Sequence, residues 1–258
     1  MPSTTSDFDR LKRLIERGFQ VEFHGHAGAI LNGDFPEALE DLANVLGDLV
    51  ISLESLVRSG GGEHILTQGL RRRLAALHWV KHNFEMKKLI DGVEKESISH
   101  EIDHVRRLSN GIVAMEIEWN NKDPFFDRDL ENFKRLHAEA AISVGVLLTR
   151  GRSLQEHLRP RIRDFAEVRE IKSFSDLVPY DLAPTRRQQA EVERRMQGGR
   201  SGQRSFAQAW SEMFVADKFG EATTHWSKLA DRVRRGVGNP CPLLLLGIPD
   251  SVMKTANE

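Results

Sequence analysis

The chain has 258 residues, 40% of them hydrophobic, and a formal net charge of −1. This length suits one large domain with a buried core, and the single cysteine, Cys241, excludes an intrachain disulfide framework. With no signal-like N-terminal segment and no apolar run long enough to cross a bilayer, we expect a cytoplasmic protein without a membrane partner.

The N-terminal third is predicted to be mostly helical. Apolar spacing predicts a short helix over Asp7–Arg17, a long helix from Pro36 to Arg58 and another from about Glu63 to Phe84, with at most a brief strand at Val21–Phe23. The 36–58 helix is amphipathic, so it fits either the core or a dimer interface. We therefore assign residues 1–90 to a helical scaffold that also serves dimerisation.

The centre of the chain changes to strand patterns. Ser99–Val105 and Ile112–Trp119 are strand-like, and Asn110-Gly111 between them is a hairpin-turn dipeptide. A helix from Asp127 to about Ala140 and a buried strand over Ile142–Thr149 follow. The order strand, strand, helix, strand predicts a mixed α/β (α+β) core within residues 97–151.

The C-terminal part, residues 152–258, is predicted to close the fold and to bind a partner. Its patterns predict helices near Ser153–Phe165, Phe206–Phe214 and Thr223–Arg235, a last strand at Pro242–Gly247, and a mobile loop or arm over the polar segment from Pro179 to Ser205. Six arginines against two glutamates lie between Arg186 and Arg204. Such a run fits phosphate contacts as well as a solvated face.

Acidic residues lie on both strands of the predicted hairpin. With a two-residue turn, regular pairing places Asp103 opposite Glu118, with Glu116 diagonal to Asp103. Because strand side chains alternate, the three carboxylates then share one face of the sheet. Like charges at these separations destabilise the strand pair unless a cation lies between them.

A divalent cation with oxygen ligands would meet this need. Mg²⁺, Mn²⁺ and Ca²⁺ prefer such ligands, and a site with open positions for water and phosphate is typical of magnesium-assisted phosphodiester hydrolysis. The spacing fits equally well an acidic face that only solubilises the hairpin, so the spacing alone does not decide between the two interpretations.

A longer stretch carries a resemblance to a known family. It comprises His100-Glu-Ile-Asp103, Ala114-Met-Glu116-Ile-Glu118-Trp119-Asn120-Asn121-Lys122-Asp123-Pro124-Phe-Phe-Asp127-Arg128-Asp129-Leu130 and Ile142-Ser-Val-Gly-Val-Leu-Leu-Thr149-Arg150-Gly151. It resembles the catalytic core of the type II restriction endonucleases related to BglII and BstYI. The segment from Thr223 to Ile248 resembles the closing part of the BstYI-like members.

The resemblance implies the PD-(D/E)xK nuclease fold, with a mixed sheet flanked by helices. It implies a homodimer that cuts both strands of a short palindrome in double-stranded DNA, with Mg²⁺ and no nucleotide cofactor. We expect Mn²⁺ to substitute and Ca²⁺ to bind without supporting cleavage. By position, Asp103 and Glu116 match metal-binding acids, Ile117 the residue whose backbone carbonyl completes the site, and Glu118 the third catalytic position.

Position 118 departs from the wider superfamily, most of whose members have lysine there. A carboxylate at this position could bind a second metal, or orient or deprotonate the attacking water. Asn83 and Glu85 are candidates to support the site from the preceding helix.

Several residues are predicted to contact DNA. The resemblance places Asn120, Asn121 and Lys122 where relatives bring polar side chains to the bases, although the same residues also suit a simple turn. The remaining candidates are Arg150, Arg186, Arg187, Arg200, Arg204, His225 and Lys228.

Two other interpretations of function remain open. One is a DNA-binding protein that keeps the nuclease fold without cleavage, and the other is a repair or structure-specific nuclease. His24 and His26 form a pair without further ligands at zinc spacing, so we expect a structural role for them, and we expect Cys241 to be a buried small side chain.

Overall fold

The computed structural model describes residues 8–58, 64–198 and 203–254. Within these residues, six strands form one mixed sheet, and from one edge to the other they are β1 (Gln20–His24), β7 (Leu243–Ile248), β6 (Val144–Arg150), β5 (Gly111–Glu118), β4 (Val93–Leu108) and β3 (Val80–Ile90). β7, β6 and β5 are parallel to one another, and β1, β4 and β3 each pair antiparallel with a neighbour. The predicted mixed sheet is therefore confirmed.

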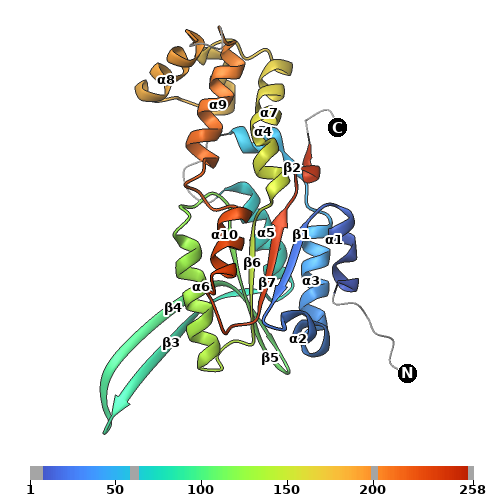
Figure 1. The fold of residues 1–258 in the computed structure, drawn as a ribbon, viewed down its shortest axis with the longest axis vertical. Coiled ribbons are helices and arrows are strands. Elements are labelled where there is room, and N and C mark those ends of the chain that lie inside the picture. The colour runs from blue at the N-terminus through green and yellow to red at the C-terminus, as the bar shows by residue number, and fades with distance from the viewer. Residues whose placement is uncertain (1–7, 59–63, 199–202, 255–258) are drawn as a thin grey trace.

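Helices cover both faces of this sheet (Figure 1). One face carries α6 (Phe125–Ala138) and α10 (Trp226–Arg234), whose apolar side chains pack on β5, β6 and β7. The other face carries the N-terminal helices, with bounds η1 Asp9–Leu11, α1 Lys12–Glu16, α2 Ala27–Asp34, α3 Pro36–Gly47, α4 Leu53–Val57 and α5 Ile65–Ala76. The N-terminal region is thus more than a helical scaffold, because it also supplies β1 and β3.

A third group of helices extends beyond one end of the sheet (Figure 1). It contains α7 (Arg152–Val168), η2 (Phe174–Tyr180), α8 (Arg186–Met196) and α9 (Phe206–Phe219). After β7 the described chain ends with η3 (Asp250–Val252) and β8 (Met253–Lys254). At the opposite end, β3 and β4 continue past the body as a two-stranded ribbon.

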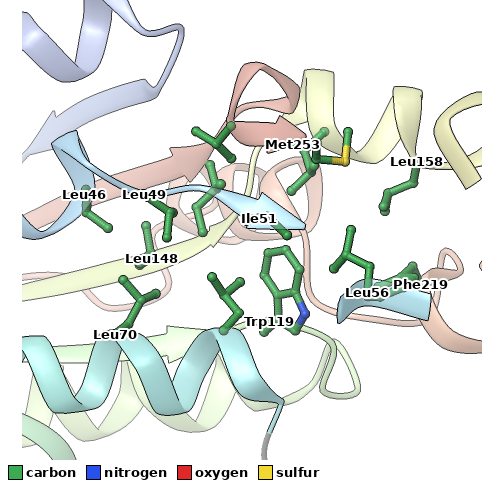
Figure 2. Close-up of a cluster of buried hydrophobic side chains, with 14 of the residues drawn as sticks. Leu46, Leu49, Ile51, Leu56, Leu70, Trp119, Leu148, Leu158, Phe219 and Met253 are labelled. Carbon is green, nitrogen blue, oxygen red and sulfur yellow. The ribbon is translucent and has the colours of Figure 1, made fainter. Parts of the chain in front are cut away.

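The main core contains side chains of the N-terminal helices and of α7 and α9, and it includes Trp119, the residue that directly follows β5. Figure 2 shows its ring beside Ile51 and Leu56, which come from the N-terminal elements. The indole is 2% exposed, and its centroid lies 6.2 Å from that of Phe219. This packing fixes the backbone where the chain leaves the sheet and starts the next loop.

The prediction of one helix from Pro36 to Arg58 is wrong. The helix α3 ends at Gly47, where the guanidinium of Arg17 donates to the backbone carbonyls of Leu46, Gly47 and Leu49. The chain then forms β2 (Ile51–Ser52), which pairs with β8, before α4 begins. The apolar spacing looked continuous because residues on both sides of the break face the same core.

The second long helix is also shorter than predicted. The helix α5 ends at Ala76, and His78 adopts a positive φ of 66° while the N–H groups of His78 and Trp79 bond back to Ala75 and Leu74. This is a left-handed helix termination. Residues from Val80 onward therefore start β3 instead of continuing the helix, so the assigned helix to Phe84 is wrong.

The predicted mobile segment from Pro179 to Ser205 contains a helix. Thr185 and Gln188 form a reciprocal capping box that starts α8. Only Val192 of this helix is buried, which explains why apolar spacing did not predict it. Ion pairs of Glu191 with Arg194 and Arg195 support the helix instead. Residues 199–202 of the predicted segment lie outside the described residues.

The other elements agree with the sequence patterns to within a few residues. The hairpin strands, the helix after them and the two buried strands are observed as β4, β5, α6, β6 and β7, although β4 begins earlier than predicted and α9 extends further. None of the helices in the described ranges is both long and apolar enough to span a membrane.

Candidate active site

The β4–β5 hairpin brings the acidic residues together in a register that differs from the prediction. Leu108 pairs with Gly111 and His104 with Met115, so Asp103 faces Glu116 and not Glu118. The Asp103 N–H lies 3.4 Å from Glu116 Oε1. A shift by two residues keeps every side chain on its face of the sheet, so Glu116 and Glu118 still share one face.

A β-bulge interrupts this regularity at Asp103. On β3 one residue, Lys81, separates Val80 from His82, whereas on β4 two residues separate their partners Val105 and Ile102. Those two residues are Asp103 and His104. The extra residue changes the alternation of side chains in β4, and the Asp103 carboxylate lies beside Lys81, at the margin of the acidic group instead of within it.

Three carboxyl groups lie buried under helix α6. Glu116 is 5% exposed, Glu118 2% and Asp129 0%. The guanidinium of Arg128 donates to Asp129 Oδ1 at 2.8 and 2.9 Å and lies 3.5 Å from Glu118 Oε1. Asn121 Nδ2 donates to Glu118 Oε2 at 2.7 Å. Glu118 is thus held from two sides.

Burial and mutual repulsion raise the pKa values of these acids. Burial, followed by the charges of Asp129, Asp103 and Glu118, raises the pKa of Glu116 well above its ordinary value. Burial and the neighbouring Asp129 raise the pKa of Glu118 to about 8, and burial also raises the pKa of Asp129. Negative charge is therefore costly here without an added cation.

Asp103 has a different environment. Its side chain is 56% exposed, and its Oδ1 lies 3.5 Å from Lys81 Nζ. It lines a cavity of about 350 Å³ together with Lys81, Ile117, Asn120 and Asn121. The acidic group thus combines one accessible acid with three buried ones.

The donor set fits a hard divalent cation. Asp103 and Glu116 offer carboxylate oxygens, and the Ile117 carbonyl belongs to the residue between Glu116 and Glu118. Among the described residues, no group of three acidic, histidine or cysteine side chains is arranged to hold a metal ion. The predicted convergence of all three acids is therefore not observed as such.

The loop after β5 lies between two cavities. Asn120 lines the cavity beside Asp103 and also a second one of about 470 Å³, which Lys122 lines as well. The second cavity is bounded by helix α9 and by the segment before α8. The structure therefore places the predicted DNA-contacting loop at the surface next to the acids.

Comparison with known proteins identifies the family. Residues 19–248 match the family described as Restriction endonuclease BglII/BglIII. The chain belongs to this family. A search of curated proteins gives no match.

Family membership assigns the activity. The chain is a restriction endonuclease, a type II site-specific DNA nuclease that hydrolyses phosphodiester bonds. DNA is its substrate, and the family typically uses a metal ion. The restriction-endonuclease interpretation is thus favoured over the non-cleaving protein and the repair nuclease.

Two of the predicted DNA contacts of this endonuclease lie inside the protein. Arg150 is 0% exposed and donates to the Thr224 carbonyl, to Thr223 Oγ1 and to the Phe219 carbonyl. His225 is 3% exposed, and its Nε2 lies 2.9 Å from Glu221 Oε2. Both side chains support the segment before α10 from inside the protein, and they are not exposed for contact with DNA.

The remaining basic candidates of the endonuclease differ in their surroundings. Arg186 and Arg187 are exposed at the start of α8, and Lys228 is half-buried on α10. Arg204 forms an ion pair with Glu212 at 2.6 Å. Arg200 lies outside the described residues.

The two proposed supporting residues are on strand β3, not on a helix. Asn83 accepts a hydrogen bond from Ser99 Oγ, and Glu85 lies 3.7 Å from Lys87. Their contacts are thus with other residues of the β3–β4 ribbon. The predicted buried state of Cys241 is observed, and burial raises the pKa of its thiol to about 12.

Sequence reasoning missed Lys81, Arg128 and Asp129 of the site. Asp129 occupies a position on the apolar stripe of α6, between Phe126, Leu130 and Phe133, and an acid on a buried helical face is a signal that could have found it. Lys81 gave no such signal, because the sequence predicted a helix at that position.

Proposed function

We propose that this endonuclease is a Mg²⁺-dependent homodimer that cuts both strands of double-stranded DNA at a short palindrome and leaves 5′-phosphates. The observation that carries the proposal is the buried Glu116, surrounded by Asp103, Glu118 and Asp129 in a chain of the BglII/BglIII family. Acids that repel one another favour the binding of a cation between them.

Asp103, Glu116 and the Ile117 carbonyl would hold the metal, in accordance with the resemblance. Bound there, Mg²⁺ would supply positive charge for the phosphate and a water of lowered pKa. Mn²⁺ is expected to replace it, and Ca²⁺ is expected to bind without supporting cleavage. The carboxylate pair supplies hard oxygen ligands on adjacent strands of a rigid sheet.

Glu118 has the role of orienting the attacking water or accepting its proton. Arg128 and Asn121 fix its carboxylate, and Asp129 lies beside it. Burial and the neighbouring Asp129 raise the pKa of Glu118, which makes its carboxylate a stronger proton acceptor. Asp129 and Arg128 then act as positioning residues through their contacts with Glu118.

The loop residues Asn120, Asn121 and Lys122 are proposed to read DNA in the major groove. Amide side chains pair with adenine and lysine with guanine or with a phosphate. The exposed Arg186 and Arg187 are proposed to contact phosphates from α8. Arg200, Arg204 and Lys228 remain phosphate candidates, whereas Arg150 and His225 are left out because they are buried.

Digestion of phage-length DNA tests this proposal. Purified protein is incubated with DNA in Mg²⁺ or in EDTA, and the fragment ends are sequenced. Discrete Mg²⁺-dependent fragments that share one palindromic end are expected. The mass of the protein in solution, measured by sedimentation, should be that of two chains.

Two variants test whether Asp103 and Glu116 are needed for cleavage. Asp103→Asn and Glu116→Gln are each expected to lower the cleavage rate at least about 100-fold, because each removes a metal ligand. Glu94→Gln is a matched control, since Glu94 is a half-exposed acid on the same strand β4 as Asp103 and is paired with Lys87. Unchanged Mg²⁺-dependent cleavage by Asp103→Asn or Glu116→Gln would contradict the assignment.

A further inference from the structure

Lys81 lies at the point where the β-bulge displaces Asp103. It is the only residue of β3 between the pairs Val80–Val105 and His82–Ile102, so it stands opposite Asp103 and His104 together. A bulge changes the direction of nearby side chains. The bulge thus places an ammonium group directly beside the candidate metal ligand.

The contacts of Lys81 leave it accessible from outside the protein. Its Nζ lies 2.7 Å from Glu101 Oε1 and 3.5 Å from Asp103 Oδ1, and its side chain is 56% exposed. It also lines the cavity of about 350 Å³ that contains Asp103 and Asn120. The ammonium therefore shares one cavity with Asp103 and with the loop proposed to read DNA.

The balance of charge around the acids points to a need for such a cation. In phosphodiester hydrolysis, negative charge builds up on the phosphate in the transition state, and lysine or arginine side chains commonly stabilise it. Arg128 is near the acids, but it already binds the fully buried Asp129 and contacts Glu118. Position 118 itself carries a glutamate, so this strand adds no positive charge.

Lys81 can exchange its partners at little cost. Glu101 and Asp103 are 60% and 56% exposed, and ion pairs at such exposure stabilise a protein by about 0 to 1 kcal/mol. A phosphate that enters the cavity can therefore replace Glu101 as the partner of the ammonium. The same exchange is unfavourable for Arg128, because it would leave the buried Asp129 carboxylate unpaired.

We propose that Lys81 is a further catalytic residue, which contacts the phosphate at the cleaved bond and stabilises its charge. The inference rests on the proposed function, with Asp103 at the reacting centre. Water oxygen forms the new bond to phosphorus and gives up a proton, for which Glu118 is the proposed acceptor. The bond from phosphorus to the 3′-oxygen breaks, its electron pair stays on that oxygen, and the oxygen takes up a proton from solvent. Lys81 transfers no proton and remains an ammonium throughout.

Single-turnover cleavage and DNA binding test this proposal together. Lys81→Ala, Lys81→Gln and Lys81→Arg are compared with the wild type on the same phage-length DNA, and binding is measured in Ca²⁺ over a series of salt concentrations. Lys87→Ala is the matched control, because Lys87 is also on β3, is 45% exposed and lies 3.7 Å from each of two carboxylates. Melting temperatures establish that each variant is folded.

Lys81→Ala and Lys81→Gln are expected to lose about 100-fold or more in cleavage rate, with less than about tenfold weaker binding. The slope of log K against log salt should fall by about 1, as for the loss of one phosphate contact. Lys81→Arg should recover part of the rate, and Lys87→Ala should behave as wild type.

Cleavage by folded Lys81→Gln at the wild-type rate, with an unchanged salt slope, would overturn the proposal. If Lys81→Ala does not fold, Lys81→Gln and Lys81→Arg decide the question. A wild-type protein that cuts no DNA would contradict the proposed function instead, and the salt slopes would still show whether Lys81 contacts a phosphate.

Discussion

Replacement of Arg150 by methionine separates an internal role from a DNA contact. The guanidinium is fully buried and donates to the Thr224 carbonyl through Nε at 3.2 Å and Nη2 at 2.6 Å. It also bonds to Thr223 Oγ1 and lies 5.0 Å from the centroid of the Phe219 ring. Burial lowers the pKa of Arg150 to about 9, so the group remains charged at neutral pH.

The contacts set the size of the expected effect. In Arg150→Met the Thr224 carbonyl loses both of these donors, whereas the Phe219 carbonyl keeps the hydrogen bond from Gln155 Nε2 at 2.8 Å. A buried carbonyl without a donor costs about 1 to 3 kcal/mol, and hydrogen bonds to a charged group contribute about 1.5 to 3 kcal/mol each. Because the variant also avoids the burial of a charge, we expect a net loss of about 2 to 4 kcal/mol in the free energy of unfolding.

Urea denaturation in EDTA measures this loss, and DNA binding at several salt concentrations measures any phosphate contact. For Arg150→Met we expect a lower midpoint and an unchanged salt slope. Arg186→Met is the control, since Arg186 is exposed, and there we expect the reverse result. A stable Arg150→Met protein with a salt slope reduced by about 1 would refute the assignment of Arg150 to the interior.

Three further changes test the packing, the pH dependence and the acidic group. In Gly145→Ala the added Cβ would lie 2.5 Å from Cδ2 of the buried Phe133, so thermal unfolding should show a loss of about 1 to 3 kcal/mol, and wild-type stability would contradict this packing. Burial lowers the pKa of His64 to about 4, so its contribution to stability is present above pH 6.5 and is lost as the pH falls toward 4. His64→Asn keeps a side-chain acceptor for the cap of α5. In urea titrations this variant should lose about 1 to 2 kcal/mol less stability than the wild type between pH 7.5 and pH 5. An equal loss in both proteins would count against a role of His64 in the pH dependence. Asp129→Asn removes a charge that raises the pKa of Glu118, so the rise of the cleavage rate with pH should move to lower pH, and an identical profile would argue against Glu118 acting in its ionised form.

The elements that the sequence predicted well are those whose pattern arises from their own residues. The strand β6 is entirely buried and the helix α6 carries one apolar stripe, so apolar spacing alone identified both. The break after Gly47 depends on hydrogen bonds from Arg17, about 30 residues away in the chain, and no local pattern contains that contact. The helix α8 depends on capping and ion pairs, which apolar spacing does not register.

In the candidate site, too, the features set by a local pattern were predicted correctly, and those set by contacts with another strand were not. Alternation along β5 correctly placed Glu116 and Glu118 on one face, and this result survived a register error of two residues because the side-chain period is also two. The position of Asp103 depends on one extra residue in β4, and alternation cannot reveal a bulge whose cause lies in the pairing with β3.

The bulge has a chemical consequence for the endonuclease. A regular β4 would place the Asp103 carboxylate on the same buried face as Glu116 and Glu118, where burial and repulsion would act on all three acids. The observed chain instead keeps the side chain of Asp103 56% exposed and pairs it with Lys81, while Asn121 and Arg128 hold the buried Glu118. One accessible acid and one accessible ammonium therefore line the same cavity, whereas Glu116 and Glu118 are buried. In the proposed function, this arrangement keeps the buried carboxyl groups fixed by the fold and leaves Asp103 and Lys81 at the surface, where they can exchange their ion-pair partners for DNA.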